Sequence, residues 1–240
     1  MTLHVLQDWA QITKARQELV NRGVSQLDRT PSLLRSLLTS LGLGHGMAVG
    51  DMVKSWDVLA TVDFLVEHVK KDQPVLDIGC YASEVLIALH ALGYSHLAGV
   101  DLNPHLSRMP YQDSIRYEVA DFRHTPFEDA SFQAITSISV IEHGFDGPAL
   151  LKEMSRLLKV GGYLITSFDY WPAKIDTTGT TFFGMEWRIF SREEVIQFVA
   201  DAASHGLKPV GELTFDSKDS PIATAGKQYT FGWLVLQRSA

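Results

Sequence analysis

The sequence predicts an α/β fold with a mostly parallel sheet covered by helices on both faces. From Pro74 onward, short apolar runs alternate with amphipathic segments, which is the pattern of a βα series. The apolar runs have the character of strands buried on both sides. With 240 residues and 45% hydrophobic content, the chain is long enough to bury a sizeable core in one elaborated domain.

The first fifty residues predict a helical extension. Residues from about Leu3 to Leu43 carry apolar side chains at three- and four-residue steps. Glycines near residues 42–50 then predict a flexible connection. Residues 1–50 therefore either pack against the domain or cap its active site. Two stripes carry the prediction, namely Trp9, Ile12, Ala15, Leu19 and Val20, and, after Pro31, Leu33, Leu34, Leu37, Leu38 and Leu41.

The remaining elements follow in order. A third helix is predicted from Ser55 to Lys70, and a capping box at Ser191 begins a helix that ends near His205-Gly206. Two β-rich runs, 209–215 and 229–237, predict an antiparallel pair at the sheet edge. Between them the series comprises strands Val75 to Ile78, Leu97 to Val100, Ile115 to Val119, Ala134 to Ser139 and Tyr163 to Phe168, helices Glu84 to Leu92 and Ala149 to Leu158, and a Gly161-Gly162 turn.

Composition narrows the classes of partner. The chain has 21 Lys plus Arg against 28 Asp plus Glu, a net charge of −7, which argues against nucleic acid as partner. The single cysteine, Cys80, excludes an intrachain disulfide and fits a reducing compartment. The start lacks a secretory pattern and no run is long enough to span a bilayer. We expect a cytoplasmic protein with a small-molecule partner and no membrane partner.

The strand ends carry the candidate ligand-binding residues. In open α/β sheets, ligands bind outside the carboxyl ends of the strands. Asp77 and Gly79 end the first strand in a turn whose N–H groups and helix dipole favour such a ligand. Asp101 follows about twenty residues later, the spacing of a ribose clamp, although it also suits a helix N-cap. Asp121 and Phe122 suit an adenine site, or else a turn held by an aspartate.

Five segments in order resemble the class I S-adenosylmethionine-dependent methyltransferases, in particular the small-molecule group whose fourth strand ends in Glu-His. The resemblance extends from about Trp56 to Arg238. It implies a Rossmann-like, seven-stranded, mostly parallel sheet with an antiparallel last strand, and methyl transfer that leaves S-adenosylhomocysteine. The segments are Val75 to Cys80, Gly99 to Pro104, Ala120 to Phe122, Phe132 to His143 and Leu157 to Leu164.

The resemblance also implies roles for single residues. Asp77 and Gly79 approach the methionine portion of the cofactor, and Asp101 holds both ribose hydroxyls. Lys54 and Trp56 close the methionine end, although a tryptophan on an apolar helical stripe is more often part of a core. The residues assigned to the cofactor are Asp77, Gly79, Cys80, Tyr81, Asp101, Leu102, Asp121, Phe122, Ser137, Ser139 and Trp56.

The glycine turn departs from the family pattern at two positions. Tyr81 and Ser83 stand where relatives usually have glycine, so the Tyr81 ring must turn away from the turn or lie against the methionine portion. Ser83 suits a cap of the following helix. The same residues disfavour a nicotinamide dinucleotide. They keep open an alternative, a non-catalytic cofactor-binding or regulatory module.

Glu142 and His143 raise the question of a metal or a base. Quinone-pathway relatives carry a further acid where this chain has Ser139, so we expect no metal. His143 is the candidate catalytic base on a substrate hydroxyl, or else it caps the next segment.

The long segment after the fifth predicted strand, about residues 170–190, is the candidate substrate lid. Its rings suit a small apolar or stacking acceptor, or else a satellite core. The acceptor atom is expected to be oxygen in preference to nitrogen or carbon. The candidate substrate residues are Tyr170, Trp171, Phe183, Trp187 and Arg188.

Overall fold

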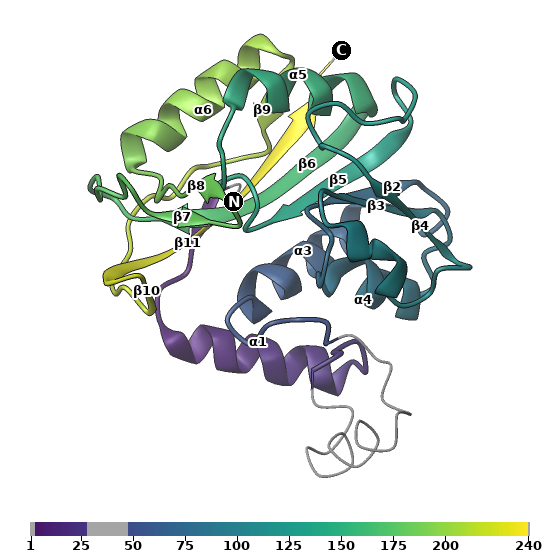
Figure 1. The fold of residues 1–240 in the computed structure, drawn as a ribbon, viewed down its shortest axis with the longest axis horizontal. Coiled ribbons are helices and arrows are strands. Elements are labelled where there is room, and N and C mark those ends of the chain that lie inside the picture. Colours follow the sequence, from purple (N-terminus) through teal and green to yellow (C-terminus); the bar gives the residue numbers. More distant parts are fainter. Residues whose placement is uncertain (1–2, 28–47, 240) are drawn as a thin grey trace.

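The computed structural model describes residues 3–27 and 48–239 (Figure 1). A central sheet has the order β1-β11-β6-β5-β2-β3-β4, and β9 and β10 also pair with β11. Its strands are β1 (Leu3–Val5), β2 (Val75–Ile78), β3 (Leu97–Asp101), β4 (Ile115–Val119), β5 (Phe132–Ile138), β6 (Leu158–Tyr170), β9 (Leu207–Pro209), β10 (Ile222–Thr224) and β11 (Lys227–Arg238). The helices are α1 (Trp9–Asn21), α3 (Ser55–His68), α4 (Val85–Ala91), the 3-10 helix η1 (Pro104–Arg108), α5 (Gly147–Leu157) and α6 (Arg192–Ser204).

The predicted sheet is confirmed. Strands β4, β3, β2, β5 and β6 run parallel, and β11 lies antiparallel to β6. The carboxyl ends of the parallel strands therefore meet at one edge, where Ile78 of β2 lies opposite Val100 of β3 and Ser137 of β5. This edge brings together the residues that the sequence predicts to bind a ligand.

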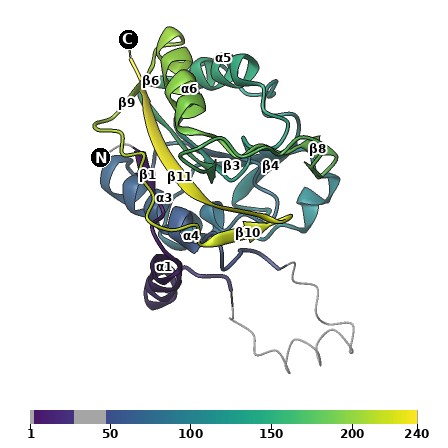
Figure 2. The same cartoon turned by 90° about the vertical axis from the view of Figure 1, so that its left-hand side faces the viewer.

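Helices cover both faces of the sheet. Helices α5 and α6 lie on one face, and α1, α3 and α4 lie on the other (Figures 1 and 2). Each face has its own core of buried side chains. One core joins α5 and α6 to the sheet through residues such as Leu151 and Phe198, and the other joins α3 and α4 through Val62 and Leu86. No helix within the described ranges is both long and apolar enough to cross a bilayer.

The N-terminus corrects one prediction. Residues Leu3–Val5 form strand β1, antiparallel to β11, and not the start of a helix. The three residues alternate buried, half-buried, buried, which is the period of a strand. Helix α1 is confirmed, with Asp8 as its N-cap, but Trp9 and Val20 of the predicted stripe are 46% and 47% exposed. The second predicted stripe, residues 33–41, lies outside the described residues.

Three further segments differ from the prediction. Strand β6 begins at Leu158, directly after α5, and Gly161 lies in an irregular stretch where the β5–β6 register shifts. The predicted strand 209–215 is replaced by the short strands β9 and β10, because β11 is long enough to pair with several partners. A small hairpin, β7 (Thr181–Phe182) and β8 (Met185–Glu186), forms within the candidate lid.

Candidate functional site

The turn after β2 is held by backbone hydrogen bonds to the neighbouring strand. The Gly79 N–H donates to the Val100 carbonyl at 2.8 Å, and the Tyr81 N–H donates to Asp101 Oδ2 at 2.9 Å. Gly79 has a φ of +68°, and a Cβ built there would lie 2.3 Å from Cγ2 of Val140. Glycine is therefore required at position 79 both by conformation and by the close approach of Val140.

The two departures from the glycine pattern fit this turn. Ala82, not Tyr81, takes the left-handed conformation, with a φ of +63°. The half-buried Tyr81 packs against the core on the α3 and α4 face. Ser83 Oγ accepts from the Val85 N–H at 3.3 Å, but the N-cap of α4 is Glu84 and not Ser83. The turn thus forms without glycine at positions 81 and 83.

Two buried polar groups at the strand ends lack partners. Asp77 Oδ1 accepts from the Thr136 hydroxyl at 2.6 Å, but Asp77 Oδ2 has no hydrogen-bond partner among the described residues. Ser137 Oγ is buried and equally unpartnered within the described chain. Burial raises the pKa of Asp77 to about 7. Because buried polar groups are normally paired, these atoms are free to accept hydrogen bonds from a ligand, and their role in ligand binding stays a prediction.

Asp101 is oriented by the backbone on both sides. Its Oδ2 accepts from Tyr81, and its Oδ1 accepts from the Asn103 N–H at 2.8 Å. A carboxylate oxygen can accept more than one hydrogen bond, so both oxygens keep capacity for a diol. Leu102 beside it is 52% exposed. Asp101 and Leu102 are thus available to a ligand at the end of β3.

Asp121 has an internal partner. Arg123 binds its carboxylate through Nε and Nη2, the latter at 2.7 Å from Oδ2, and the hydrogen bonds from this guanidinium lower the pKa of Asp121. Phe122 is half-buried against the core on the α5 and α6 face. The adenine role of Asp121 and Phe122 stays a prediction, in which an exocyclic N–H shares the carboxylate with Arg123.

Two other predicted cofactor residues lie inside the cores. The Cys80 side chain is fully buried, and a Cβ built on Gly99 would lie 2.6 Å from its sulfur, so only the Cys80 backbone faces the turn. Burial raises the pKa of the Cys80 thiol. Trp56 is half-buried and packs between two clusters of core residues. The proposed contact of Trp56 with the cofactor stays a prediction.

A buried ion pair between Arg16 and Glu84 stabilises the turn after β2 from the side of α1. Arg16 of α1 donates from Nη1 to both carboxylate oxygens of Glu84 at 2.9 Å, and from Nε to Ser55 Oγ at 2.9 Å. Glu84 is the N-cap of α4, and the Gly50 N–H donates to the Ala82 carbonyl at 2.9 Å. The N-terminal helix therefore fixes the same turn that the sheet fixes from the other side.

A second polar cluster gathers farther along the sheet, around Lys54. Lys54 Nζ donates to Ser139 Oγ at 2.5 Å and lies 4.0 Å from the centre of the Phe231 ring. The other members are three buried carboxyl groups, which we call the acid cluster: Asp57, Glu142 and Asp169.

The carboxyl groups of the acid cluster differ in their partners. Asp57 accepts from the Ser167 hydroxyl at 2.8 Å, and Asp169 Oδ2 accepts from Trp187 Nε1 at 2.7 Å. Neither oxygen of Glu142 has a hydrogen-bond partner among the described residues. Burial raises the pKa of Asp57 to about 6 and raises those of Glu142 and Asp169, and the Asp169 charge raises that of Glu142 further.

His143 lies beside the acid cluster. Burial and the charge of Lys54 lower its pKa to about 4, so the ring is neutral at pH 7. Its Nδ1 is buried without a partner in the described chain, and its ring meets the Phe183 ring edge-on at 5.3 Å. A neutral imidazole is the form that accepts a proton, but the low pKa makes it a weak base. The catalytic role of His143 stays a prediction.

The candidate substrate residues divide into two groups. Phe183 is 85% exposed, and Arg188 stacks on the Phe145 ring at 5.0 Å. Trp171 is half-buried against the cluster that contains Trp187. Tyr170, in contrast, is fully buried, and its hydroxyl donates to the Phe215 carbonyl at 2.7 Å. Tyr170 thus serves the core, whereas Phe183 and Arg188 are accessible.

The lid is attached to the segment that follows β5. The Arg188 N–H donates to the Glu142 carbonyl at 2.9 Å, and the Gly144 N–H donates to the Glu186 carbonyl at 2.8 Å. His143 and Trp187 form an isolated β-bridge. The backbone of the candidate lid therefore lies against the backbone of the segment that contains Glu142.

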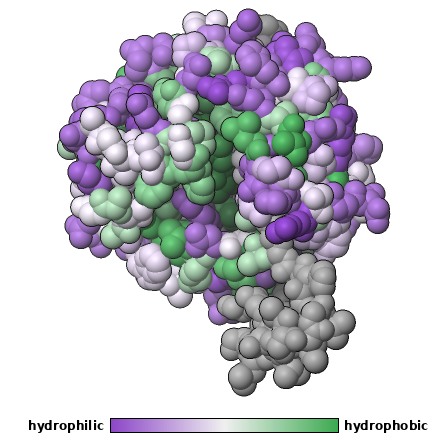
Figure 3. Space-filling model, in the orientation of Figure 1, coloured by the Kyte–Doolittle hydropathy of each residue, from purple (hydrophilic) through white to green (hydrophobic). Residues whose placement is uncertain are grey.

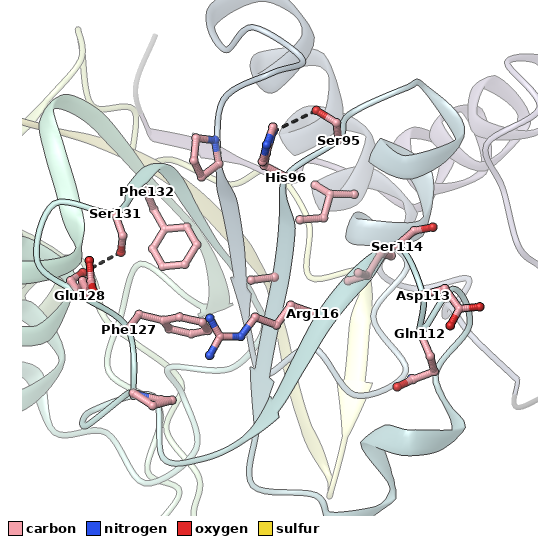
Figure 4. Close-up of a pocket in the computed structure, with 15 residues that line it drawn as sticks. Ser95, His96, Gln112, Asp113, Ser114, Arg116, Phe127, Glu128, Ser131 and Phe132 are labelled. Carbon is pink, nitrogen blue, oxygen red and sulfur yellow. Dashed lines mark hydrogen bonds between the residues drawn. The ribbon is translucent and has the colours of Figure 1, made fainter.

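The molecule is hollowed in two places. Figure 3 shows a hollow near the middle of one face, with hydrophobic residues inside it. A separate open groove of about 870 Å³ lies at the amino ends of β2, β3, β4 and β5, where Arg116 stacks on Phe127 and His96 contacts Ser95 (Figure 4). This groove is at the opposite sheet edge from Asp77 and Asp101, so we do not place the ligand there.

A metal site is not formed by the described side chains. No group of three or more His, Cys, Asp or Glu residues in residues 3–27 and 48–239 has an arrangement that could hold a metal ion. Lys54 interacts electrostatically with the acid cluster.

The comparisons with known proteins agree with this geometry. Residues 76–166 match the family described as "Methyltransferase domain". This segment of the chain is therefore similar to a methyltransferase domain. A solved relative in fold is geranyl diphosphate C-methyltransferase from Streptomyces coelicolor A3(2), in complex with Mg²⁺, geranyl diphosphate and S-adenosyl-L-homocysteine. It superposes with a TM-score of 0.53 at 22% identity, over 80% of this chain and 87% of that one.

Two curated relatives match part of this chain. A ubiquinone biosynthesis O-methyltransferase of Xanthomonas oryzae pv. oryzae is 32% identical over 100 residues, which are 39% of this chain and 41% of that protein. Phosphoethanolamine N-methyltransferase 1 of Arabidopsis thaliana is 31% identical over 109 residues, which are 43% and 22%. The matched segment thus spans less than half of the curated relatives, which act on different acceptors by name.

Sequence reasoning missed part of the site. Asp57 was not singled out, because it reads as an ordinary polar position in a helix. Arg16 and Glu84 were missed as well, since they are 68 residues apart. One signal was available, because a charged residue among apolar helical residues can indicate a buried ion pair. It does so only when the partner residue is also known.

Proposed function

We propose that this protein transfers a methyl group from S-adenosylmethionine to a small-molecule acceptor. One observation carries the proposal: two hydrogen-bond acceptors lie at adjacent strand ends. They are the Asp101 carboxylate, which the backbone orients, and Asp77 Oδ2, which has no partner among the described residues. A ribose diol and an ammonium group are donors that suit these two acceptors. The buried Ser137 hydroxyl adds a third unpartnered group on β5.

The residues of the chain fit the cofactor without rearrangement of the turn. The turn at Gly79 is already formed, and Asp101 would hold the ribose while Asp77 meets the methionine amino group. When bound, the cofactor supplies an activated methyl group on a sulfonium. The protein then has to position the acceptor in line with that methyl group and exclude water.

The acceptor is proposed to be a small molecule, with oxygen as the atom expected from the sequence. The net charge of −7 supports this over nucleic acid, which requires a basic face. The relatives that match in sequence include an O-methyltransferase. We also propose a cytoplasmic location, which the single, buried and unpaired Cys80 supports.

Binding of S-adenosylhomocysteine tests the proposal. Isothermal titration of the full chain should detect binding, and Asp101→Ala should weaken it by about 100-fold, because a charged hydrogen-bond acceptor contributes about 1.5–3 kcal/mol. Asp113→Ala is the matched control, since this exposed aspartate lines the groove at the opposite edge. Equal affinity in Asp101→Ala and Asp113→Ala would contradict the ribose assignment.

A turnover assay separates an enzyme from a binding module. Wild-type protein, S-adenosylmethionine and a panel of phenols, alcohols and amines should release S-adenosylhomocysteine with at least one acceptor. Binding without release across the panel would favour the non-catalytic alternative.

A further inference from the structure

The acid cluster holds more negative charge than the described chain balances. Asp57, Glu142 and Asp169 surround one cation, Lys54, which interacts electrostatically with all three. Removing a carboxylate from water is costly unless it is paired or hydrogen-bonded. The cluster therefore either keeps protons on its carboxyl groups or receives a further cation.

Glu142 is the member of the acid cluster that most lacks hydrogen-bond partners among the described residues. It is 1% exposed, and both of its carboxylate oxygens lack a hydrogen-bond partner among the described residues. Asp57 accepts from Ser167, whereas Asp169 accepts from Trp187 through Oδ2 only, and its Oδ1 is unpartnered among the described residues. A buried group with two free acceptor atoms requires a ligand with two or more donor hydrogens.

The cluster lies on the acceptor side of the sheet. The cofactor residues Asp77 and Asp101 belong to β2 and β3, whereas Asp169 belongs to β6, two strands from β2 across β5. Glu142 follows β5 and lies under the lid backbone at Arg188. Asp169 is thus separated along the sheet from Asp77 and Asp101.

Aromatic rings enclose the same place. Trp187 donates to Asp169 and packs edge-on against Phe182 at 5.2 Å and Tyr229 at 5.6 Å. The Phe231 ring already accepts the Lys54 ammonium. Faces of aromatic rings beside carboxylates form a favourable environment for an ammonium group. A hydroxyl offers one donor hydrogen and no charge, so it satisfies the cluster less well than an amine.

We propose that Glu142 and Asp169 bind the amino group of the methyl acceptor, which is a small amine with an aromatic or apolar body. This inference rests on the proposed methyl transfer and deepens it by naming the acceptor class. It favours nitrogen over the oxygen expected from the sequence.

The chemistry balances with the groups at hand. The bound ammonium gives one proton to the Glu142 carboxylate, which leaves a neutral amine and a carboxylic acid. The amine lone pair then forms the bond to the methyl carbon, and the carbon–sulfur bond breaks with its electron pair going to sulfur. The product is a methylated ammonium, and the Glu142 proton returns to solvent when the product leaves.

A matched pair of probes tests the acceptor class. 2-Phenylethylamine and 2-phenylethanol have the same body and differ in the donor group. With the full chain saturated with S-adenosylhomocysteine, we expect titration to show at least tenfold tighter binding of the amine. Glu142→Gln, which keeps the shape of the side chain, should abolish this preference. Glu186→Gln, on the exposed part of the lid, should leave it unchanged.

Three results would overturn the proposal. The first is equal binding, or no binding, of the two probes by the wild type. The second is an amine preference that survives in both Glu142→Gln and Asp169→Asn, which serve as independent removals of a buried charge. The third is a loss of S-adenosylhomocysteine affinity in Glu142→Gln with unchanged affinity for 5′-methylthioadenosine, because the cluster would then hold the amino group of the cofactor.

The cofactor titration keeps the two proposals apart. Failure of the wild type to bind S-adenosylhomocysteine contradicts the proposed function itself. Retained binding of S-adenosylhomocysteine in Glu142→Gln, within twofold of the wild type, with loss of amine binding supports the acceptor assignment alone.

Discussion

The two halves of the sheet edge are built by different means. On the side of β2 and β3, the candidate site consists of backbone turns and two aspartates directly at strand ends. On the side of β6 and β11, it consists of side chains from α3, the segment after β5, β6 and the lid. The first half depends on local geometry, and the second depends on packing between distant segments.

This difference suggests that the two halves of the site have different roles in ligand binding. A site made of backbone groups depends little on the side chains around it, whereas a site made of packed side chains changes with each substitution. We therefore expect variants of the first half to act on cofactor affinity and variants of the second half to act on acceptor choice.

The largest expected effect comes from the support of the cofactor turn. Arg16→Met leaves Glu84 buried without its partner, so the free energy of unfolding should fall by about 3–5 kcal/mol. Urea denaturation followed by circular dichroism measures this change. Arg22→Met is the control, because its pairs with Glu18 and Asp63 are exposed and should contribute less than about 1 kcal/mol. Similar losses in the two variants would contradict the supporting role of Arg16.

Gly79→Ala is expected to be nearly as disruptive. The new Cβ would meet Val140 at 2.3 Å in a left-handed conformation, so strain and overpacking together should cost about 3 kcal/mol. Gly179→Ala, with a φ of +77° and no atom within 4 Å, isolates the conformational part at about 1 kcal/mol. Val140→Ala in the Gly79→Ala background should recover part of the loss. No recovery would show that the clash with Val140 is not the cause.

Asp77 makes the stability of the protein depend on pH. Burial raises its pKa from 3.8 to about 7 in the folded protein. Between pH 4 and pH 7 the folded state then holds a proton that the unfolded state has lost, so this group makes the stability fall as the pH rises through that window. Relative to Asp77→Asn, the wild type should lose on the order of 2 kcal/mol between pH 4 and pH 7.

The same proton links Asp77 to the cofactor. An ammonium group beside Asp77 favours its charged form, so binding of S-adenosylhomocysteine at pH 6.5 should release a proton. Titrations in two buffers of different ionisation enthalpy measure this release. It should disappear in Asp77→Asn and persist in Glu142→Gln. Its absence from the wild type would remove the methionine assignment of Asp77.

The smallest effect is expected at the tip of the lid. Phe183 is 85% exposed, so Phe183→Ser should change the free energy of unfolding by less than about 0.5 kcal/mol and leave cofactor affinity unchanged. We expect only the KM for the acceptor to rise. A loss of S-adenosylhomocysteine affinity in this variant would contradict the expectation that the two halves act on different ligands.

The same contrast explains what could be predicted from the sequence. Asp77, Gly79 and Asp101 lie next to apolar runs that reveal their strands, so their positions at one edge follow from the pattern of the chain. The conformation of the turn near position 81 could not be predicted. Its left-handed residue is Ala82, and an alanine in the sequence does not indicate a left-handed conformation. The acid cluster could not be predicted as a unit, since Asp57 and its hydrogen-bond partner Ser167 are 110 residues apart in the sequence. The same holds for β1, three residues whose strand partner is more than 200 positions away.

The pairing of β1 with β11 also has a consequence for the order of folding. Leu3 lies opposite Leu234, and the Leu6 N–H donates to the Phe231 carbonyl at 2.9 Å. Because a ribosome makes β1 before β11, the first strand has no partner until almost all of the described chain has emerged. Contacts of such long sequence separation form slowly. This side of the sheet is therefore completed only when β11 has been synthesised.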